Sequence, residues 1–395
     1  MSGDRAIPYG RQWVGPDDVA AVAEALRGDW LTQGPTVRRF EDALAERCGA
    51  RHAVAVANGT VALHLACLAV GVGPGDEGIT SPITFLASAN CMIYCGGRPV
   101  FADIDPRTWN IDPDEIERRV TARTKVVIPV HFGGLPCDMA EIRAIADRHG
   151  LKVIEDACHA LGAEYRGRRV GGCGTADLTC FSFHPVKHIT TGEGGAIVTD
   201  DDGLAEKLRT LRHHGITKDP ALMERNDGPW YYEAHAIGHN GRITDFQCAL
   251  GLTQLSKLDG FLGRRREIAD RYRAELTGIP GLSLQDAVPD RTHAYHLFVA
   301  HLDPERYSRR QVFEKLVADR IVPQVHYVPV NRQPAIRRVA GDQGPFPHAE
   351  RYYDGALSLP MFPGLRDDDV ATVLESLERA LRSSPPSSKE AVSHG

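Results

Sequence analysis

The sequence predicts an α/β fold, with a large domain built on a mostly parallel sheet and a smaller α+β domain after it. Short apolar runs alternate with helical patterns over the first part of the chain. This alternation requires crossover connections, and therefore parallel strands that helices cover on both faces. After about Asp245 a long helical run and shorter mixed elements replace the alternation. We therefore expect a large domain over residues 1–257, a small domain over 258–382 and a disordered tail over 383–395.

The expected elements follow from this periodicity. Apolar runs indicate strands of the large sheet at 53–57, 99–102, 125–131, 152–155, 179–183 and 196–199. Helical spacing predicts helices over 17–27, 61–70, 112–120 and 139–149. In the second domain we expect one long helix over 244–276, strands over 293–302 and 324–330, and helices over 308–320 and 367–381.

Composition limits the possible functions. The chain has 395 residues, of which 42% are hydrophobic and 25% charged, and its formal net charge of −6 offers no basic field for nucleic acid or an anionic membrane. No apolar stretch reaches the ~20 residues that a membrane span requires, and the first residues lack the apolar core of a signal peptide. Nine scattered cysteines without a CxxC pair favour reduced thiols, so we expect a cytoplasmic protein.

Two motifs carry little weight. The glycines of Gly73–Gly78 match GxGxxG, but a helical pattern precedes them and a strand follows. A dinucleotide fingerprint needs the opposite order, so these residues predict a loop. His235 and His239 stand four apart, yet the segment holds two glycines and no third ligand at usable spacing, so we expect no metal site.

The first chemical signal is Asn58-Gly59-Thr60, between an apolar strand and a helix. The start of a helix presents unpaired amides to which phosphate binds, and glycine allows close approach. By itself the segment also fits a capped turn.

The second signal is Asp156, at the carboxyl end of an expected strand, with His159 just after it. Ligand-binding groups gather at this edge of a parallel sheet. A carboxylate here could keep a pyridine nitrogen protonated, although strand-end aspartates also act as simple caps.

The third signal is Lys187, between the apolar strand that ends near Ser182 and a glycine-rich turn. A lysine in such a setting can be deprotonated enough to form an imine with an aldehyde. Each signal alone is weak, but lysine, carboxylate and phosphate turn together are much stronger evidence for one ligand-binding site.

These segments resemble the DegT/DnrJ/EryC1/StrS sugar aminotransferases, which are pyridoxal-phosphate-dependent enzymes of fold type I. The resemblance runs from about Tyr9 to Leu381 and is carried by WLTQGPTVRRFEDALA, VANGTVALHLA, SPITFLASAN, IEDACHALG, FSFHPVKHITTGEGGAIVT and GHNGRITDFQCALGLTQL. Within the family, EDACHALG, VPVHFGGLPCDM and QVHYVPV look most like the branch that serves pseudaminic acid synthesis.

The resemblance implies a role for each matching residue. Lys187 would be the catalytic lysine that forms the Schiff base, and Asp156 would pair with the pyridine nitrogen. The further cofactor residues would be Gly59, Thr60, Ser182, Phe85, His159 and, from a second subunit, Asn240. Substrate contacts are expected from Tyr9, Asp29, Trp30, Leu31, Thr32, Arg242, His326 and Tyr327.

The resemblance also implies an activity. We expect a homodimer with shared sites that moves an amino group from L-glutamate to C4 of a UDP-4-keto-6-deoxy-N-acetylhexosamine of the L-altro configuration. Relatives that act as dehydratases carry histidine in place of Lys187, so the lysine favours transamination. One departure is Gly241, where relatives carry an aromatic residue, which predicts a more flexible partner loop or a wider site.

Three alternatives stay open at this stage. The same chemistry could act on another keto sugar nucleotide, such as the D-gluco epimer or a perosamine precursor. A regulatory protein could retain the fold without catalysis, although the set of Lys187, Asp156 and Thr60 argues against it. An NAD-dependent sugar-nucleotide enzyme is disfavoured by the misplaced GxGxxG.

Overall fold

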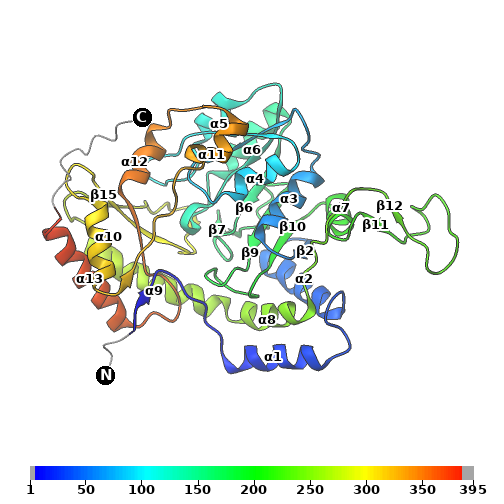
Figure 1. Ribbon diagram of the computed structural model, residues 1–395, viewed down its shortest axis with the longest axis horizontal. Helices are drawn as coiled ribbons and strands as arrows, with labels where there is room; N and C mark the ends of the chain where they lie inside the picture. Colours follow the sequence, from blue (N-terminus) through cyan, green and yellow to red (C-terminus); the bar gives the residue numbers. More distant parts are fainter. Residues whose placement is uncertain (1–4, 385–395) are drawn as a thin grey trace.

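A seven-stranded sheet forms the centre of the molecule, as the computed structural model shows (Figure 1). The structure describes residues 5–384. Five neighbouring strands are parallel, and one inserted strand, β10, runs antiparallel to both of its neighbours. The strands in spatial order are β2 (His52–Val56), β10 (Gly195–Thr199), β9 (Leu178–Ser182), β6 (Lys152–Asp156), β5 (Thr124–Ile128), β3 (Glu77–Thr80) and β4 (Arg98–Phe101).

Helices cover both faces of this sheet, because alternate residues of each strand point to opposite sides. Val54 and Val56 of β2 pack in one hydrophobic cluster with α3 (Gly59–Ala69), α4 (Ala87–Tyr94) and α7 (Asp202–Arg212). Ala53 and Ala55 pack on the other side with α2 (Pro35–Cys48) and α8 (Asp245–Ser256). The helix α1 (Pro16–Arg27) lies outside α8, and α5 (Pro113–Arg119) and α6 (Met139–His149) cover the far end of the sheet.

The C-terminal part has its own three-stranded antiparallel sheet and its own hydrophobic cluster. Its elements are α9 (Leu258–Leu276), β13 (Leu282–Leu284), β15 (Phe298–Leu302), α10 (Arg309–Ala318), α11 (Pro334–Ala340), α12 (Pro347–Gly355), β17 (Ala356–Leu359) and α13 (Asp367–Arg382). The first strand of the chain, β1 (Ile7–Pro8), pairs with β16 (Ile321–Val322) and brings Ile7 into this cluster. The expected boundary at residue 257 stays a prediction.

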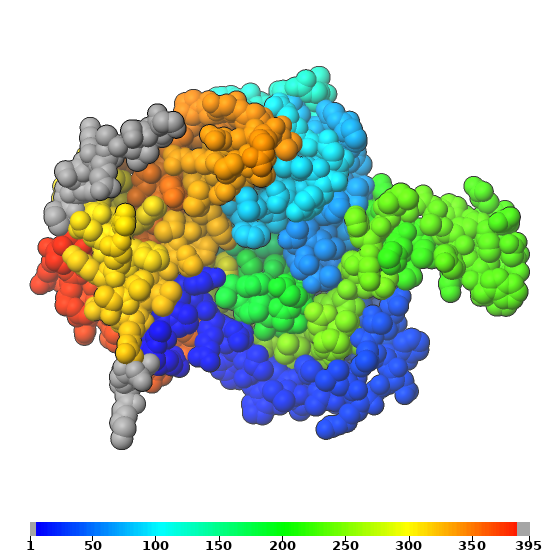
Figure 2. All heavy atoms as spheres, viewed as in Figure 1, coloured from blue at the N-terminus to red at the C-terminus, as the bar shows by residue number. Residues whose placement is uncertain are grey.

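A small hairpin projects from the body of the molecule. The strands β11 (Ile216–Thr217) and β12 (Glu233–Ala234) form it, and residues 218–232 connect them. Figures 1 and 2 show this segment, hereafter the arm, extending away from the rest of the chain. A smaller sheet of β7 (Glu164–Tyr165), β8 (Arg168–Arg169) and β14 (Arg291–Thr292) lies elsewhere on the surface.

The predicted α/β architecture is confirmed, and each expected strand of the large sheet is present within a few residues. The helices α2, α4 and α7 are not singled out by the sequence patterns that we used. The tail expected to be disordered lies outside the described residues from position 385 onward.

Two expectations for the second domain are wrong. The helical run over 244–276 is two helices, because the chain leaves α8 at Lys257, whose side chain forms ion pairs with Asp17 and Asp18 of α1. The strand over 324–330 is absent from the structure. Only Gln324 pairs with Ser358 there, after which the chain crosses to the large sheet.

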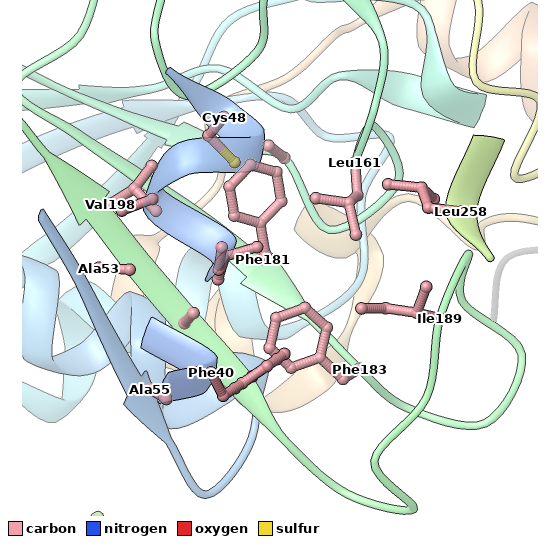
Figure 3. Packing of buried hydrophobic residues seen from close by; sticks show 14 of the residues in the cluster. Phe40, Cys48, Ala53, Ala55, Leu161, Phe181, Phe183, Ile189, Val198 and Leu258 are labelled. Carbon is pink, nitrogen blue, oxygen red and sulfur yellow. The ribbon is translucent and has the colours of Figure 1, made fainter. Parts of the chain in front are cut away.

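The hydrophobic cluster on the α2 side lies directly beneath the segment that carries Lys187. Phe40 of α2 is fully buried, and its ring meets that of Phe183 edge-on at a centroid distance of 5.4 Å. Figure 3 shows both rings with Phe181 and Ile189 around them. Phe183 and Ile189 flank Lys187 in sequence, so this packing fixes both ends of its loop.

Replacing Phe40 with alanine should therefore destabilise the protein by about 3–5 kcal/mol, because it opens a cavity at a site that cannot collapse. The thermal unfolding midpoint of Phe40→Ala, compared with that of the wild type, measures this loss. Val317→Ala, at an exposed position of α10, is the control. Equal midpoints for the two variants would contradict the importance of this packing.

Candidate active site

Three chain segments meet at the carboxyl-terminal edge of the sheet. Asp156 ends β6, Ser182 ends the neighbouring strand β9, and Gly59 begins α3 after β2. Parallel strands deliver the groups that follow them to one common edge, which is where α/β proteins bind ligands. The topology therefore brings together the three signals that the sequence predicts separately.

The turn before α3 is closely packed. The Asn58 side chain accepts a hydrogen bond of 2.9 Å from the Val61 amide and so caps the helix. A Cβ added at Gly59 would lie 2.9 Å from Cβ of Ser182 and 3.4 Å from Sγ of Cys158. Only glycine fits there, and the Ser182 hydroxyl consequently lies beside the first amides of α3. Thr60, one residue further, is half-buried.

Asp156 is held by two hydrogen bonds at a buried position. Ser88 of α4 donates its hydroxyl to Oδ2 at 2.6 Å, and the Cys158 amide donates to Oδ1 at 3.2 Å. Thr84 Oγ1 lies 2.7 Å from the Ser88 hydroxyl. These contacts fix the orientation of the carboxylate. The sequence offers no signal for Ser88 beyond its place in SPITFLASAN, because only the tertiary fold brings α4 to β6.

Lys187 follows β9 in a turn where its amide donates to the His184 carbonyl at 2.9 Å. Burial lowers the pKa of Lys187, and the nearby Cys158 and Asp156 act in the opposite direction. A lowered pKa increases the fraction of neutral amine, which is the form that attacks carbonyl groups and accepts protons.

Neutral histidines surround this lysine. His159 Nε2 lies 3.1 Å from the Tyr327 hydroxyl, and its ring centroid is 4.3 Å from that of His296. Burial and the charge of Lys187 hold the pKa of both histidines well below the usual range. His326, which contacts the Ser358 hydroxyl at 2.8 Å, has its pKa lowered to about 3 for the same reasons. The sequence patterns do not indicate His296.

Segments far apart in the sequence contribute aromatic side chains to the site. Tyr9 lies against His326 with a centroid distance of 5.1 Å, and Phe85 lies 6.2 Å from the ring of Tyr327. A Cβ at Gly10 would lie 3.3 Å from Cβ of Val186, which places the N-terminal segment beside the lysine turn. Phe85 is 56% exposed, so its ring is available to a ligand.

Six predicted site residues have contacts in the single chain other than those described above. The segment from Asp29 to Thr32, with the exposed Trp30 and Leu31, contacts the start of α8, where the Asp245 amide donates to the Leu31 carbonyl. Arg242 lies 2.7 Å from Nδ1 of His213, and the exposed Asn240 pairs with His213 at the base of the arm.

Gly241 is firmly packed in the chain. Its amide donates to the Arg212 carbonyl, and its own carbonyl accepts from the Ala57 amide. A Cβ at this position would lie 3.0 Å from Cγ1 of Val61 on α3. The backbone at Gly241 is therefore hydrogen-bonded on both sides, and the glycine lets it lie close to α3.

The residues at the sheet edge fit pyridoxal phosphate on three counts. The buried Nδ1 of His159 has no hydrogen-bond partner among the described residues, so a polar group of a ligand could satisfy it. The first turn of α3 lies beside the Ser182 hydroxyl, and the amides at the start of a helix favour an anion. Asp156 is a fixed carboxylate near Lys187, the pairing that such a ring and its aldehyde require.

Comparison with known proteins decides the family. The DegT/DnrJ/EryC1/StrS aminotransferase family matches residues 13–378. The chain belongs to this family. It is a sugar aminotransferase that depends on pyridoxal phosphate.

Individual relatives extend over nearly the whole chain. The spore coat polysaccharide biosynthesis protein SpsC of Bacillus subtilis is 45% identical over 375 residues, which cover 94% of this chain and 96% of SpsC. The structure of PseC from Helicobacter pylori, an aminotransferase involved in the biosynthesis of pseudoaminic acid, has a TM-score of 0.89 at 31% identity, covering 96% of this chain and 100% of that one. The PLP form of the putative sugar aminotransferase Spr1654 from Streptococcus pneumoniae has a TM-score of 0.89 at 27% identity, covering 95% and 99%.

The described residues contain neither a metal-binding cluster nor a membrane-spanning helix. No group of three or more His, Cys, Asp or Glu side chains between residues 5 and 384 is placed to hold a metal ion. No helix in that same part of the chain combines the length and apolar character needed to cross a membrane.

The Ser88–Asp156 hydrogen bond is open to a direct test. Ser88→Ala should lower kcat roughly 10- to 100-fold, because a hydrogen bond to a charged group contributes about 1.5–3 kcal/mol. Steady-state kinetics measures the loss, and the thermal midpoint checks that this small substitution leaves the fold intact. Ser283→Ala, on β13 far from the site, is the matched control. Wild-type kcat in Ser88→Ala would show that Asp156 does not need this donor.

Proposed function

We propose that this aminotransferase moves an amino group from L-glutamate to C4 of a UDP-4-keto-6-deoxy-N-acetylhexosamine of the L-altro configuration, as a step in pseudaminic acid synthesis in the cytoplasm. The observation that carries this proposal is the likeness to PseC, which covers 96% of this chain with a TM-score of 0.89. The motifs EDACHALG and QVHYVPV, which place His159 and Tyr327 in hydrogen-bond contact, support it.

The cofactor would be held by the residues at the sheet edge. Pyridoxal phosphate, when bound, supplies a ring that withdraws electrons from the carbon bearing the amino group. Asp156 would pair with the ring nitrogen, and His159 would contact the ring hydroxyl. The amides at Gly59 and Thr60, with the Ser182 hydroxyl, would hold the phosphate, while Phe85 would cover the ring.

Lys187 performs the proton transfers. Its neutral amine takes the proton from the α-carbon of glutamate, and in the second half-reaction it delivers a proton to C4 of the sugar. The buried histidines around it stay uncharged and so do not compete for that proton. The rings of Tyr9, His326 and Tyr327 contact one another in series, and these residues would contact the sugar nucleotide.

The likeness to SpsC favours a second candidate. SpsC, at 45% identity, resembles this chain in sequence more than PseC does, at 31%. SpsC takes part in spore coat polysaccharide biosynthesis, so the same chemistry on a different keto sugar nucleotide, such as the D-gluco epimer or a perosamine precursor, is the alternative.

A half-reaction separates these candidates. The enzyme is converted to its aminated form with glutamate, freed of glutamate and mixed with a single keto sugar nucleotide, while the visible band of the lysine-bound cofactor is recorded. The L-altro sugar should restore the band at least roughly tenfold faster than its D-gluco epimer. The two epimers present their groups differently to the site, so their transition states are bound differently. Lys187→Ala, which cannot form this bond, is the control. Faster recovery with the epimer would favour the second candidate.

We further propose that the enzyme is a homodimer whose arm completes the partner's site. The arm and the segment after it expose large apolar side chains, with Trp230 at 73% and Ile237 at 92% exposure. Such side chains, projecting from the body, are typical of a surface that a second copy covers. Asn240 lies at the base of the arm and would then reach the cofactor of the partner.

Mixing two impaired variants tests the shared site. Lys187→Ala and Asn240→Ala should each be weakly active alone. If Asn240 serves the partner's site, a mixed dimer holds one site with both defects and one intact site. Random mixing then restores about one quarter of wild-type activity, since about half of the dimers are mixed. A mixture no more active than the mean of its two parents would show that Asn240 serves its own chain.

A further inference from the structure

The two ring nitrogens of His159 have different surroundings. His159 follows β6 at the edge of the large sheet, and its side chain is buried. Its Nε2 lies 3.1 Å from the hydroxyl oxygen of Tyr327. Its Nδ1 is also buried but has no hydrogen-bond partner in the part of the chain that the structure describes. A buried polar atom without a partner is uncommon in proteins, so Nδ1 is the nitrogen that faces a ligand.

The ring of Tyr327 is held in place against that of His159. The two rings lie nearly parallel, with 18° between their planes and 6.1 Å between their centroids. The ring of Phe132 meets both of them edge-on, at 6.4 Å from Tyr327 and 6.3 Å from His159. The backbone before Tyr327 is fixed as well, because the Tyr352 hydroxyl donates to the His326 carbonyl at 2.6 Å. The contact between the hydroxyl and Nε2 therefore rests on packing from several elements.

Both partners of this contact stay uncharged. Burial and the charge of Lys187 hold the pKa of His159 well below its usual range. Burial and the nearby Asp156 raise the pKa of the Tyr327 hydroxyl. At neutral pH the hydroxyl consequently keeps its proton, and the imidazole carries one proton on only one of its two nitrogens.

The direction of the hydrogen bond follows from its donors and acceptors. His159 Nε2 is the only hydrogen-bond partner of the Tyr327 hydroxyl among residues 5–384. If Tyr327 donates, Nε2 is the acceptor and Nδ1 carries the proton of the ring. If Nε2 donates instead, both the Tyr327 proton and the Nδ1 lone pair lack a partner among those residues. The first arrangement leaves only the Nδ1–H group unpaired, so it costs less.

A proton on Nδ1 suits the group that His159 would contact. The cofactor position proposed above puts His159 beside the ring hydroxyl of pyridoxal phosphate, whose oxygen can accept a hydrogen bond. A donor stabilises the ionised form of such an oxygen. The other tautomer of His159 would present a lone pair to the same oxygen, which repels it.

We propose that Tyr327 is a positioning residue that fixes the tautomer of His159, so that Nδ1–H donates to the ring oxygen of the cofactor. Tyr327 acts through His159 and need not contact the ring itself. The inference rests on the contact between His159 and the ring hydroxyl proposed above, and it does not depend on which sugar the enzyme aminates. It gives Tyr327 a role in addition to the expected contact with the substrate.

Nitrogen-15 NMR of the full-length enzyme, freed of cofactor and labelled at its histidines, tests the tautomer. The protonated and unprotonated nitrogens of a neutral imidazole give well-separated signals, and the signals of His159 are those that disappear in His159→Gln. In the wild type the proton should be on Nδ1, and in Tyr327→Phe it should move at least in part to Nε2. Tyr307→Phe is the matched control, because it removes a hydroxyl that donates to the Pro280 carbonyl at 2.9 Å, beside the C-terminal hydrophobic cluster.

The affinity for pyridoxal phosphate gives a second measurement that does not depend on turnover. Tyr327→Phe should weaken binding of the cofactor to the cofactor-free enzyme roughly three- to tenfold, which is the effect of one hydrogen bond. His159→Gln carries an amide donor that needs no tautomer, so adding Tyr327→Phe to it should change the affinity by less than roughly twofold. Tyr307→Phe should leave the affinity unchanged.

Several results would overturn the proposal. These are a wild-type His159 protonated on Nε2, the same tautomer in Tyr327→Phe as in the wild type, or an unchanged affinity in Tyr327→Phe. An equal loss of affinity from Tyr327→Phe with and without His159 would also do so, because Tyr327 would then act independently of His159. The wild-type spectrum tests the tautomer even if Tyr327→Phe does not fold. Since no measurement uses a sugar nucleotide, failure of the proposed substrate would leave these results unaffected.

Discussion

The turn between β2 and α3 lies so close to the ends of β9 and β10 that neither Gly59 nor Gly195 has room for a side chain. A Cβ at Gly195 would lie 2.6 Å from the carbonyl carbon of Asn58, and one at Gly59 would lie 2.9 Å from Cβ of Ser182. This contact sets the first turn of α3 against the end of β9. The same backbone packing therefore positions both the turn before α3 and the segment that leads to Lys187. The hydrophobic cluster around Phe40 packs against this segment and stabilises it.

Burial then sets the chemistry of the groups that this packing gathers. Removing charged groups from water disfavours their charged forms, so Lys187 and the histidines around it shift toward neutrality. Asp156 is buried too, but the Ser88 hydroxyl and the Cys158 amide supply the hydrogen bonds that a carboxylate needs. An amine with a lowered pKa beside a fixed carboxylate is suited to proton transfer on carbon.

Within one chain, some of the expected site residues meet near Lys187 and others make different contacts. Tyr9, His326 and Tyr327 meet near Lys187 although the chain runs through both sheets between them. The segment from Asp29 to Thr32 contacts the start of α8, and Asn240 pairs with His213 at the base of the arm, near exposed apolar side chains. Gly241 is packed closely on Val61, and its backbone is hydrogen-bonded to Arg212 and Ala57.

The sequence by itself determined the alternation of strands and helices, the order of the phosphate turn, Asp156 and Lys187, and the family, because each depends on local periodicity or on short motifs. It did not determine Ser88 as the donor to Asp156 or His296 beside His159. It also predicted a strand where the chain turns inward after Gln324 to place Tyr327. These features join residues that are far apart in the sequence. A local sequence pattern does not specify a distant partner, so only the packing of the helices on the sheet decides which side chains meet.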